Sequence, residues 1–374
     1  MSDSEHTLST AQGRFTLHRI PHRPRELLRA FDAADEYLLN YIAEQNLDDA
    51  RLLIINDNFG ALAVALHTYQ PLAWSDSYLS QQATHLNLQH NNIADSSISL
   101  LNSLVILNGV FTHVLIKVPK TLALLEDQLF KLRPHLNQNS QIILAGMIKN
   151  LPPSVWKLTE RLIGSTHTSL AQKKARLIFA KYDETLKVPT NPYPSSYRLE
   201  HTNYQLINHA NVFSRDSLDI GTRFFLPHIP NRPNAKHIID LACGNGVIGL
   251  IAAEKNPHAQ LHFVDESFMA IASAQENFQR AFGTTHNANF QVSNGLTEFA
   301  TNSADLILCN PPFHQQQTIG DYLAKQFFHD AKRVLKQGGE LRLVANRHLP
   351  YYVELKRLFN NCQTIASNNK FNIL

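Results

Sequence analysis

Short strand-like runs alternate with helical segments through the second half of the chain, and this alternation constrains the fold more than any other feature of the sequence. The strand-like runs cover residues 237–241, 260–264, 289–292, 305–309 and 340–345. Helical spacing covers residues 247–255, 267–282 and 321–336, and the glycine pair 338–339 is expected to end the last helix. Because parallel strands are joined through crossover helices, the pattern predicts a doubly wound parallel sheet with ligands at the carboxyl ends of its strands.

The first half of the chain repeats this layout in the same order. The corresponding segments are residues 52–55, 61–67, 73–76, 80–91 and 114–120. We therefore predict an α/β chain of two tandem Rossmann-like folds that arose by duplication. The first copy keeps only Gly60 in its glycine loop and has Lys-Val-Pro-Lys where the second has Asn-Pro-Pro-Phe. It is predicted to be degenerate and to have lost the cofactor, whereas the second copy is predicted to be catalytic.

A proline-rich segment separates the two copies. Pro189, Pro192 and Pro194 interrupt both the helical and the strand periodicity. The predicted organisation is a degenerate domain over residues 1–183, a linker over residues 184–198 and a catalytic domain over residues 199–374. A chain of 374 residues is long enough for two domains that each have a core.

Composition excludes several classes of protein. No run approaches the roughly 18 apolar residues that a membrane helix needs, and the first residues lack the basic and apolar pattern of a secretory signal. Cys243, Cys309 and Cys362 have no ligand-like spacing, which indicates a reducing compartment and no structural metal. We expect a cytoplasmic protein that neither enters a membrane nor binds a metal.

Basic residues gather near the end of the first half. The net charge of the chain is only +3, so affinity for nucleic acid would have to come from such a local patch. Residues 149–181 are rich in Lys and Arg and contain a single acidic residue, Glu160. Lys173, Lys174 and Arg176 are the candidate RNA-binding residues. A solvated surface without a ligand is the alternative.

The segment Asp-Leu-Ala-Cys-Gly-Asn-Gly, from Asp240 to Gly246, lies between a predicted strand and a predicted helix and is typical of a cofactor-binding turn. Gly244 and Gly246 lack side chains, so backbone N–H groups around Asn245 and at the helix start can approach an anionic group such as a carboxylate. Asp240, at the strand end, can bind an ammonium directly or through water. We assign these four residues to cofactor binding.

Asp265 and Asn294 follow the next two strands and complete the predicted cofactor site. Residues 244–249 also match G-x-G-x-x-G, and Asp265 lies near the ribose-binding distance from it. The Asp265 carboxylate suits the ribose of either a nicotinamide dinucleotide or S-adenosylmethionine, so it does not discriminate between them. Capping of the following helix by Asp265 is the alternative, although Ser267 is also available. Asn294 is expected near an adenine amine.

Asn310-Pro311-Pro312-Phe313 follows the fourth strand, beside the switch point of the sheet. The exocyclic amine of guanine is a poor nucleophile because its lone pair is delocalised into the ring. The Asn310 side-chain oxygen and the Pro311 carbonyl can accept its two N–H groups and so direct the lone pair toward a methyl donor. Proline fixes φ and removes a donor, and Phe313 can stack on an extruded base. An ordinary strand-to-loop turn is the alternative.

At these motifs the chain resembles the class I methyltransferases that modify exocyclic amines, and among them the ribosomal RNA guanine-N2 enzymes of the RsmC/RlmG group. The similar segments are residues 33–39, 115–125, 208–215, 218–225, 240–246, 310–316 and 344–349. The resemblance implies two tandem class I methyltransferase folds and S-adenosyl-L-methionine as the cofactor. It also implies a guanine of the large-subunit RNA, guanine 1835, as the target, and a first domain that assists RNA binding.

The same resemblance implies that the segment from Phe213 to Thr222 covers the cofactor. Two positions depart from the family pattern: Ala242 replaces a glycine in the turn, and Asn294 replaces the commoner Asp. Neither change removes a group that the reaction needs.

Other functions remain open from the sequence. A nicotinamide-dependent dehydrogenase is favoured by G-x-G-x-x-G and Asp265, but Asn-Pro-Pro-Phe has no role in hydride transfer. A methyltransferase acting on 16S RNA, or on the amide of a protein glutamine, would use the same acceptor groups. A non-catalytic RNA-binding protein would not need the intact turn and Asn310. The sequence does not determine the oligomeric state.

Overall fold

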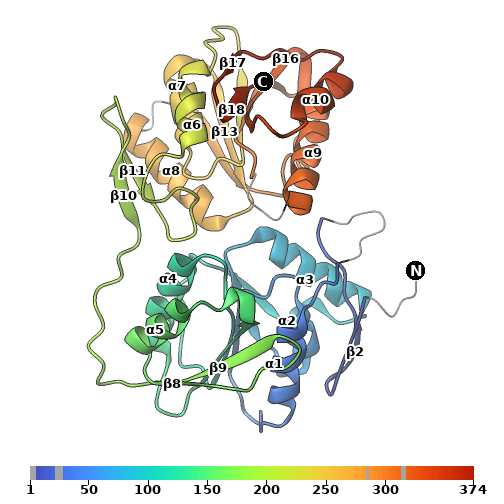
Figure 1. Cartoon of the computed structure of the whole chain (residues 1–374), viewed down its shortest axis with the longest axis vertical. Helices are drawn as coiled ribbons and strands as arrows, with labels where there is room; N and C mark the ends of the chain where they lie inside the picture. The colour runs from blue at the N-terminus through green and yellow to red at the C-terminus, as the bar shows by residue number, and fades with distance from the viewer. Residues whose placement is uncertain (1–5, 22–27, 284–285, 313–316) are drawn as a thin grey trace. The chain divides into compact units, whose positions relative to one another are not determined.

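The computed structural model describes residues 6–21, 28–283, 286–312 and 317–374. The chain divides into two compact units, Met1–Pro192 and Tyr193–Leu374 (Figure 1). The predicted linker, residues 184–198, includes a strand at its carboxyl end. Residues Ser195–Arg198 form strand β10, which pairs antiparallel with β11 (Gln205–Asn208). The proline interruptions end at Pro194, and the four residues after it alternate in burial as a strand does.

The first unit is built on a sheet with helices on both faces. Its sheet strands are β3 (Leu52–Ile55), β4 (Leu72–Ser75), β5 (Ser99–Asn102), β6 (His113–Lys117), β7 (Gln141–Met147), β8 (Thr166–Thr168) and β9 (Ala175–Lys181). Its helices are α1 (Ala33–Ala43), α2 (Ala61–Ala65), α3 (Tyr78–His90), α4 (Leu122–Leu132) and α5 (Pro153–Leu162). A hairpin of β1 (Thr7–Thr10) and β2 (Gly13–Thr16) precedes them.

The second unit has the same plan. Its sheet strands are β12 (His237–Leu241), β13 (Gln260–Asp265), β14 (Ala288–Val292), β15 (Ala304–Cys309), β16 (Leu335–Asn346), β17 (Ala366–Ser367) and β18 (Phe371–Ile373). Its helices are α6 (Ile220–Phe225), α7 (Val247–Lys255), α8 (Phe268–Phe282), α9 (Gln317–Val334) and α10 (Tyr351–Phe359).

The two sheets have matching strand orders, β5-β4-β3-β6-β7-β9-β8 and β14-β13-β12-β15-β16-β18-β17. In each sheet the first five strands of this order run parallel and the last two pair antiparallel. This confirms the predicted pair of tandem Rossmann-like folds. In the second sheet the order reverses between β12 and β15, so the switch point lies at their carboxyl ends.

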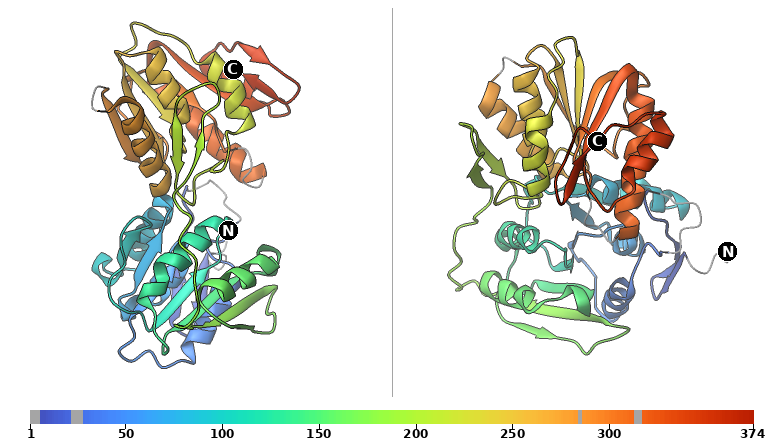
Figure 2. Two further views of the ribbon diagram at one scale, coloured as in Figure 1. Left: turned by 90° about the vertical axis from the view of Figure 1, so that its left-hand side faces the viewer. Right: turned by 45° about the horizontal axis from the view of Figure 1, so that its top comes forward.

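Strand β12 shows why the central strands read as continuous apolar runs. Ile238 and Ile239 point to opposite faces of the sheet, and both are buried. Ile238 belongs to a core cluster that includes Leu250 of α7, whereas Ile239 belongs to one that includes Phe328 of α9 and Leu355 of α10. Helices therefore cover both faces (Figure 2), and each such side chain contributes roughly 1.5–3 kcal/mol by its burial.

The end of α9 differs from the prediction. The helix ends at Val334, and β16 begins at the next residue, so Gly338 lies inside the strand rather than at a helix end. Ala304 pairs with Leu335 and Leu306 pairs with Glu340, so the register of β16 shifts between them. Gly338, with φ of 78°, serves this bulge.

Candidate active site

The polar residues predicted for the second unit gather at one edge of its sheet. Asp240 lies in β12, where it pairs with Phe263 of β13 and Leu308 of β15. Asp265 is the last residue of β13, and Asn310 directly follows the last residue of β15. Because these strands are adjacent and parallel, their carboxyl ends meet at the same edge. The structure thus brings Asp240, Asp265 and Asn310 together.

The turn between β12 and α7 needs residues with unusual backbone conformations. Gly244 and Gly246 have φ of 55° and 79°. A Cβ on Gly246 would lie 2.8 Å from the Cβ of Ala274, so a side chain there would push the turn off α8. A Cβ on Gly244 would meet nothing within 4 Å, so this side of the turn is open. Ala242 has φ of 57°, a region that costs a non-glycine residue roughly 1–2 kcal/mol.

The Asp265 carboxylate joins the turn to the start of α8. Its Oδ2 accepts a hydrogen bond from the Gly244 N–H at 2.9 Å, and its Oδ1 accepts one from the Ser267 N–H at 3.0 Å. The N-cap of α8 is Ser267, whose hydroxyl accepts from the Ala270 N–H at 3.1 Å. The Ser267 hydroxyl therefore caps the helix, and the Asp265 carboxylate links Ser267 to the open glycine.

Asp240 is a buried carboxyl group with one unused oxygen. Its Oδ2 accepts from the Gly249 N–H at 2.7 Å, whereas its Oδ1 is buried and has no hydrogen-bond partner among the described residues. Burial raises the pKa of Asp240 to about 7; the Gly249 bond opposes this shift and the neighbouring Asp265 charge adds to it. A buried acceptor without a partner is unfavourable, so this oxygen suits a cationic donor such as an ammonium.

The Asn245 side chain stabilises the turn. Its Nδ2 donates to Asn208 Oδ1 at 2.9 Å and to the Tyr197 hydroxyl at 3.3 Å. Asn277 Nδ2 donates to the Asn245 carbonyl at 3.0 Å. These bonds tie the turn to β10, β11 and α8, and Asn245 Oδ1 accepts from the Val247 N–H at 3.2 Å. Among the described residues, the backbone N–H of Asn245 is then the group left for the cofactor contact that we assigned to it. Sequence reasoning missed Tyr197, Asn208 and Asn277 because they lie far from the turn along the chain.

Asn310 is held by the start of helix α6. Its Nδ2 donates to Thr222 Oγ1 at 2.9 Å and to Asp219 Oδ2 at 3.2 Å. The same Asp219 oxygen accepts from the Thr222 N–H at 2.8 Å and caps α6. Because a carboxylate only accepts hydrogen bonds, the amide group facing it must be the NH2, which leaves Asn310 Oδ1 without a hydrogen-bond donor among the described residues. The sequence indicated Thr222 as a cofactor residue and gave Asp219 no role.

The remaining predicted site residues are less engaged. Pro311 is buried and Pro312 is partly buried, and neither has a backbone N–H. Phe313 lies outside the described residues. Phe213 is 58% exposed, so it is available to cover a ligand. Asn294 accepts from Gln326 Nε2 at 3.2 Å through its side-chain oxygen.

The first unit carries an altered version of the same turn, in which a carboxylate fills the helix start. Gly60 begins α2 with φ of 80°, as Gly246 begins α7. The buried Asp57 Oδ2 accepts from the N–H groups of Leu62 and Ala63, both at 2.9 Å. Ala63 occupies the place of Gly249, so Asp57 makes from the loop the bond that Asp240 makes from the strand. A ligand carboxylate would compete with Asp57 for these N–H groups, as expected if the first copy has lost the cofactor.

Lys117 of the first unit stands in the position of Asn310. Ile116, the residue before it, pairs with the end of β3 as Cys309 pairs with the end of β12. Lys117 Nζ lies 2.8 Å from Asp32 Oδ1 and 2.7 Å from Asp35 Oδ1. Asp32 caps α1 as Asp219 caps α6, and Asp35 has the position of Thr222. The amide contacts of the second unit are thus replaced by an ion triad.

The predicted RNA-binding residues lie at the hairpin between β8 and β9. Lys173 is 77% exposed and its Nζ lies 2.8 Å from Glu36 Oε2. Lys174 is exposed, and its ammonium has no partner within the part of the chain that the structure describes. Arg176 is half-buried, and its Nε has no hydrogen-bond partner among those residues. The Lys and Arg residues of this hairpin are therefore not all equally free to bind phosphate.

Cys243, Cys309 and Cys362 are all unbridged. Burial raises the pKa of the Cys243 and Cys309 thiols well above the usual value, which is consistent with packing roles. Over the described ranges, no cluster of His, Cys, Asp and Glu has the makings of a metal site, and no helix has the length and apolar content to cross a membrane.

Known proteins match the chain over both units. Residues 5–184 match the RLMG N-terminal domain family, and residues 203–374 match the methyltransferase small domain family. The chain is 49% identical to ribosomal RNA large subunit methyltransferase G of Pseudomonas paraeruginosa over 98% of each chain. It is 48% identical to the protein of that name from Aeromonas salmonicida, again over 98% of each chain. The chain belongs to the ribosomal RNA large subunit methyltransferase G family. Membership confirms the resemblance predicted from the sequence and decides against a dehydrogenase.

A solved structure shares the tandem fold of this methyltransferase G family member. The T. thermophilus 16S rRNA N2 G1207 methyltransferase (RsmC), in complex with AdoMet and guanosine, superimposes with a TM-score of 0.75. The match covers 100% of this chain and 99% of the other at 20% identity, so it establishes the fold of the whole chain.

The residues of this methyltransferase G site fit S-adenosylmethionine, the cofactor predicted from the sequence. The open side of Gly244 gives room for a ligand to approach the turn. The buried, unpartnered Asp240 Oδ1 suits the ammonium of the methionine part. An anion near the start of α7 is favoured as at other helix starts, although the Val247 and Gly249 N–H groups already donate to Asn245 Oδ1 and Asp240 Oδ2. No loop carboxylate fills this position, in contrast to Asp57 in the first unit.

Proposed function

We propose that the chain transfers a methyl group from S-adenosyl-L-methionine to the exocyclic N2 amine of a guanine in 23S ribosomal RNA, which by family resemblance is guanine 1835. The observation that carries this chemistry is the orientation of Asn310. Its NH2 group donates to Thr222 and Asp219, so its oxygen is the atom left for a substrate. An exocyclic amine offers the N–H donors that this oxygen needs. The names of the relatives support ribosomal RNA as the substrate class.

The chain acts on the amine by positioning it. One N–H donates to Asn310 Oδ1 and the other to the Pro311 carbonyl, which withdraws the nitrogen lone pair from the ring. When bound, S-adenosylmethionine supplies a sulfonium methyl group, and the C–N bond forms as the C–S bond breaks. The methylated amine is then strongly acidic and loses its proton to water, so no protein base is needed. Most of the acceleration comes from orientation.

Several residues of the sheet edge are assigned to the cofactor. We assign the ammonium to Asp240 and the carboxylate to the backbone around Gly244. Asp265 is assigned to the ribose hydroxyls, because a carboxylate accepts hydrogen bonds from hydroxyl groups. Asn294 is assigned to the adenine amine and Phe213 to the cover over the site.

Lys173, Lys174 and Arg176 are assigned to RNA phosphates, where binding would release counterions. Lys173 is engaged with Glu36, so phosphate must compete for it, whereas Lys174 is free of such a partner among the described side chains. Lys174→Ala should therefore weaken RNA binding and flatten its salt dependence more than Lys173→Ala. Equal affinities for both variants and the parent chain would assign this hairpin to a solvated surface.

The test of the proposed function uses labelled S-adenosylmethionine with 23S RNA, 16S RNA and the assembled subunits that contain them. Label is expected in N2-methylguanine of 23S RNA, identified by digestion and mass spectrometry. Asn310→Ala should abolish turnover and leave S-adenosylmethionine affinity within about twofold. Asn294→Ala is the matched control, because it removes an amide from the same sheet edge and should weaken cofactor binding instead.

Other results would contradict the proposal in different ways. Label in 16S RNA would move the target to the small subunit. Label on protein would point to glutamine methylation, which uses the same acceptor groups. Unchanged turnover of Asn310→Ala would refute the role of the carboxamide.

A further inference from the structure

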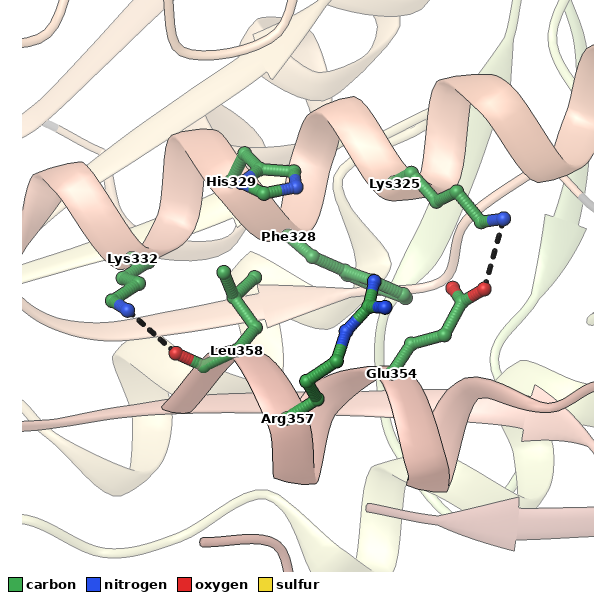
Figure 3. Close-up of a pocket in the computed structure, with 7 residues that line it drawn as sticks. All are labelled: Lys325, Phe328, His329, Lys332, Glu354, Arg357 and Leu358. Carbon is green, nitrogen blue, oxygen red and sulfur yellow. Dashed lines mark hydrogen bonds and ion pairs between the residues drawn. The ribbon is translucent and has the colours of Figure 1, made fainter. Parts of the chain in front are cut away.

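A groove lies between helices α9 and α10 of the second unit, on the side of the sheet that these helices cover (Figure 3). Its polar lining residues are mostly basic. From α9 it is lined by Lys325, Phe328, His329 and Lys332, and from α10 by Glu354, Arg357 and Leu358. Spacings of three, four and seven residues place each set on one helix face, so the two faces oppose each other.

Arg357 is unusual among the arginines of this unit. The others have carboxylate or carbonyl partners, as Arg223 has with Glu200 and Arg280 has with Glu276. Arg357 is exposed and, within the ranges that the structure describes, has no ion pair or hydrogen bond. Figure 3 shows its guanidinium standing between the two helices. A planar fork of donors without an internal acceptor is suited to an external anion.

The neighbouring cations are held in place around it. Lys332 Nζ donates to the Leu358 carbonyl at 2.6 Å, which fixes its charge at one end of the groove. Lys325 Nζ lies 2.9 Å from Glu354 Oε1 at the other end, so the groove's acidic group is already neutralised. The positive charges of Arg357 and Lys332 are therefore not balanced inside the groove.

One wall of the groove is helix α9, which follows the candidate active-site residues along the chain. Asn310 and Pro311 lie at the carboxyl edge of the sheet, and α9 begins soon after them along the chain. At 1.5 Å per residue, Lys325 and Lys332 lie roughly 12 and 22 Å along α9 from its start. Nucleotides that flank a base at Asn310 have phosphates within such a distance.

We propose that the groove between α9 and α10 binds backbone phosphates of the substrate RNA, with Arg357 and Lys332 as the contacts. The proposal rests on the proposed function only in taking RNA as the substrate. It adds an RNA site on the catalytic unit itself, distinct from the hairpin of the first unit. Phosphate on RNA and free phosphate share the same recognition chemistry, so the test includes both.

The test compares Arg357→Ala with Lys356→Ala. Both remove one positive charge from the same turn of α10, and both residues are exposed, but Lys356 does not line the groove. Affinity for a 23S RNA fragment is measured at several salt concentrations, with S-adenosylhomocysteine present so that no methyl transfer occurs. Arg357→Ala should weaken binding roughly fivefold to tenfold and reduce the salt slope by about one, whereas Lys356→Ala should do neither.

Several controls separate this proposal from others. S-adenosylmethionine affinity and the melting temperature should be unchanged in Arg357→Ala, so a loss of fold cannot explain the result. If Arg357→Ala and Lys356→Ala weakened RNA binding equally, the proposal would be overturned, because the general positive charge of α10 would then explain both losses. The proposal would also be overturned if millimolar inorganic phosphate bound in the groove but Arg357→Ala left the affinity for RNA unchanged. A failure of the proposed function would give a different result: the wild-type chain would bind RNA but would form no N2-methylguanine in the labelling assay.

Discussion

The carboxamide nitrogen of Asn310 lies 3.2 Å from the Oδ2 of Asp219, a residue 91 positions earlier in the chain. Asp219 also caps helix α6 through the Thr222 N–H. One carboxylate thus sets both the start of a helix and the direction of an amide. Asn310, which we propose faces the substrate, is thus oriented by a segment that the family resemblance assigned to covering the cofactor.

Asp219 can be tested as a positioning residue. Asp219→Ser keeps a cap for α6 but removes the carboxylate acceptor from Asn310. We expect kcat to fall about tenfold to hundredfold, the equivalent of a charged hydrogen bond, because the amide can then turn over. S-adenosylmethionine affinity and KM for RNA should change less than threefold. Steady-state kinetics gives kcat and KM, and calorimetry gives the affinity for S-adenosylmethionine. A wild-type kcat in Asp219→Ser would show that Asp219 acts only as a cap.

Asp240 should make cofactor affinity depend on pH. In the free protein the pKa of Asp240 is about 7, because burial disfavours the charge. Below pH 7 the carboxyl is mostly protonated and must ionise before it can bind an ammonium, so affinity should fall by up to tenfold per pH unit. The α-amino group of the cofactor loses its charge above about pH 8, so affinity should also decline there.

The control for this prediction is Asp240→Asn, which should bind S-adenosylmethionine weakly and with a much flatter pH profile.

The raised pKa of Asp240 also has a consequence for the stability of the fold. The folded state holds a proton that the unfolded state releases near pH 3.8, the ordinary pKa of Asp, so the folded state loses stability as pH rises from about 4 to 7. Asp240→Asn should lack this contribution. An identical pH dependence of unfolding in the variant would show that Asp240 titrates normally.

Ala242 offers a stabilising substitution. Its φ of 57° is strained for alanine, and glycine relieves that strain while adding freedom to the unfolded chain. Ala242→Gly should therefore raise the free energy of unfolding by about 0.5–1 kcal/mol. Ala252→Gly, inside α7, should lower it by about 1 kcal/mol or more. Urea denaturation compares the two; a loss of stability in both would mean that Ala242 makes contacts that outweigh its backbone strain.

The ion triad of the first unit should be costly to break. Burial works to lower the pKa of Lys117, but Asp35 and Asp32 outweigh it and raise that pKa. Lys117→Met would leave Asp35 buried without a counter-charge and should destabilise the first unit by about 3 kcal/mol or more. Adding Asp35→Asn should recover much of the loss, since it removes the unpaired charge.

The loss of stability in Lys117→Met should be smaller at acidic pH. Burial already raises the pKa of Asp35 to about 7, and removal of the lysine raises it further. Asp35 then folds as the neutral acid at low pH, and stability is lost as pH rises through its folded pKa. Thermal melts at pH 5.5 and 8 check this sign. S-adenosylmethionine affinity, a property of the second unit, should be unchanged throughout.

Much of the fold followed from local patterns. β3, β12 and α7 begin and end where predicted, because each is a largely apolar segment next to a glycine turn. The end of α9 was wrong because a glycine pair is equally suited to a helix end and to a bulge, and only pairing with Ala304 decides between them. A tertiary pairing of this kind leaves no periodic signal.

The candidate site was predictable to a similar extent. Asp240, Asp265 and Asn310 could be found because each lies at or just after the carboxyl end of a strand, and parallel strands end at one edge. Asp219 and Tyr197 could not be found, because their contacts join segments that are far apart in the chain. The equivalence of Lys117 with Asn310 also became visible only through the register of the two sheets.

Asp57 has a consequence for how the two halves can change over time. Regaining a ligand site in the first unit would require an acidic residue at Ile54, the counterpart of Asp240, and the removal of Asp57 from the loop. Either change alone is harmful, since it leaves two carboxylates competing for the Ala63 N–H or a buried helix end with no acceptor. Each single substitution is therefore expected to lower stability, so a ligand site in this half needs both changes together.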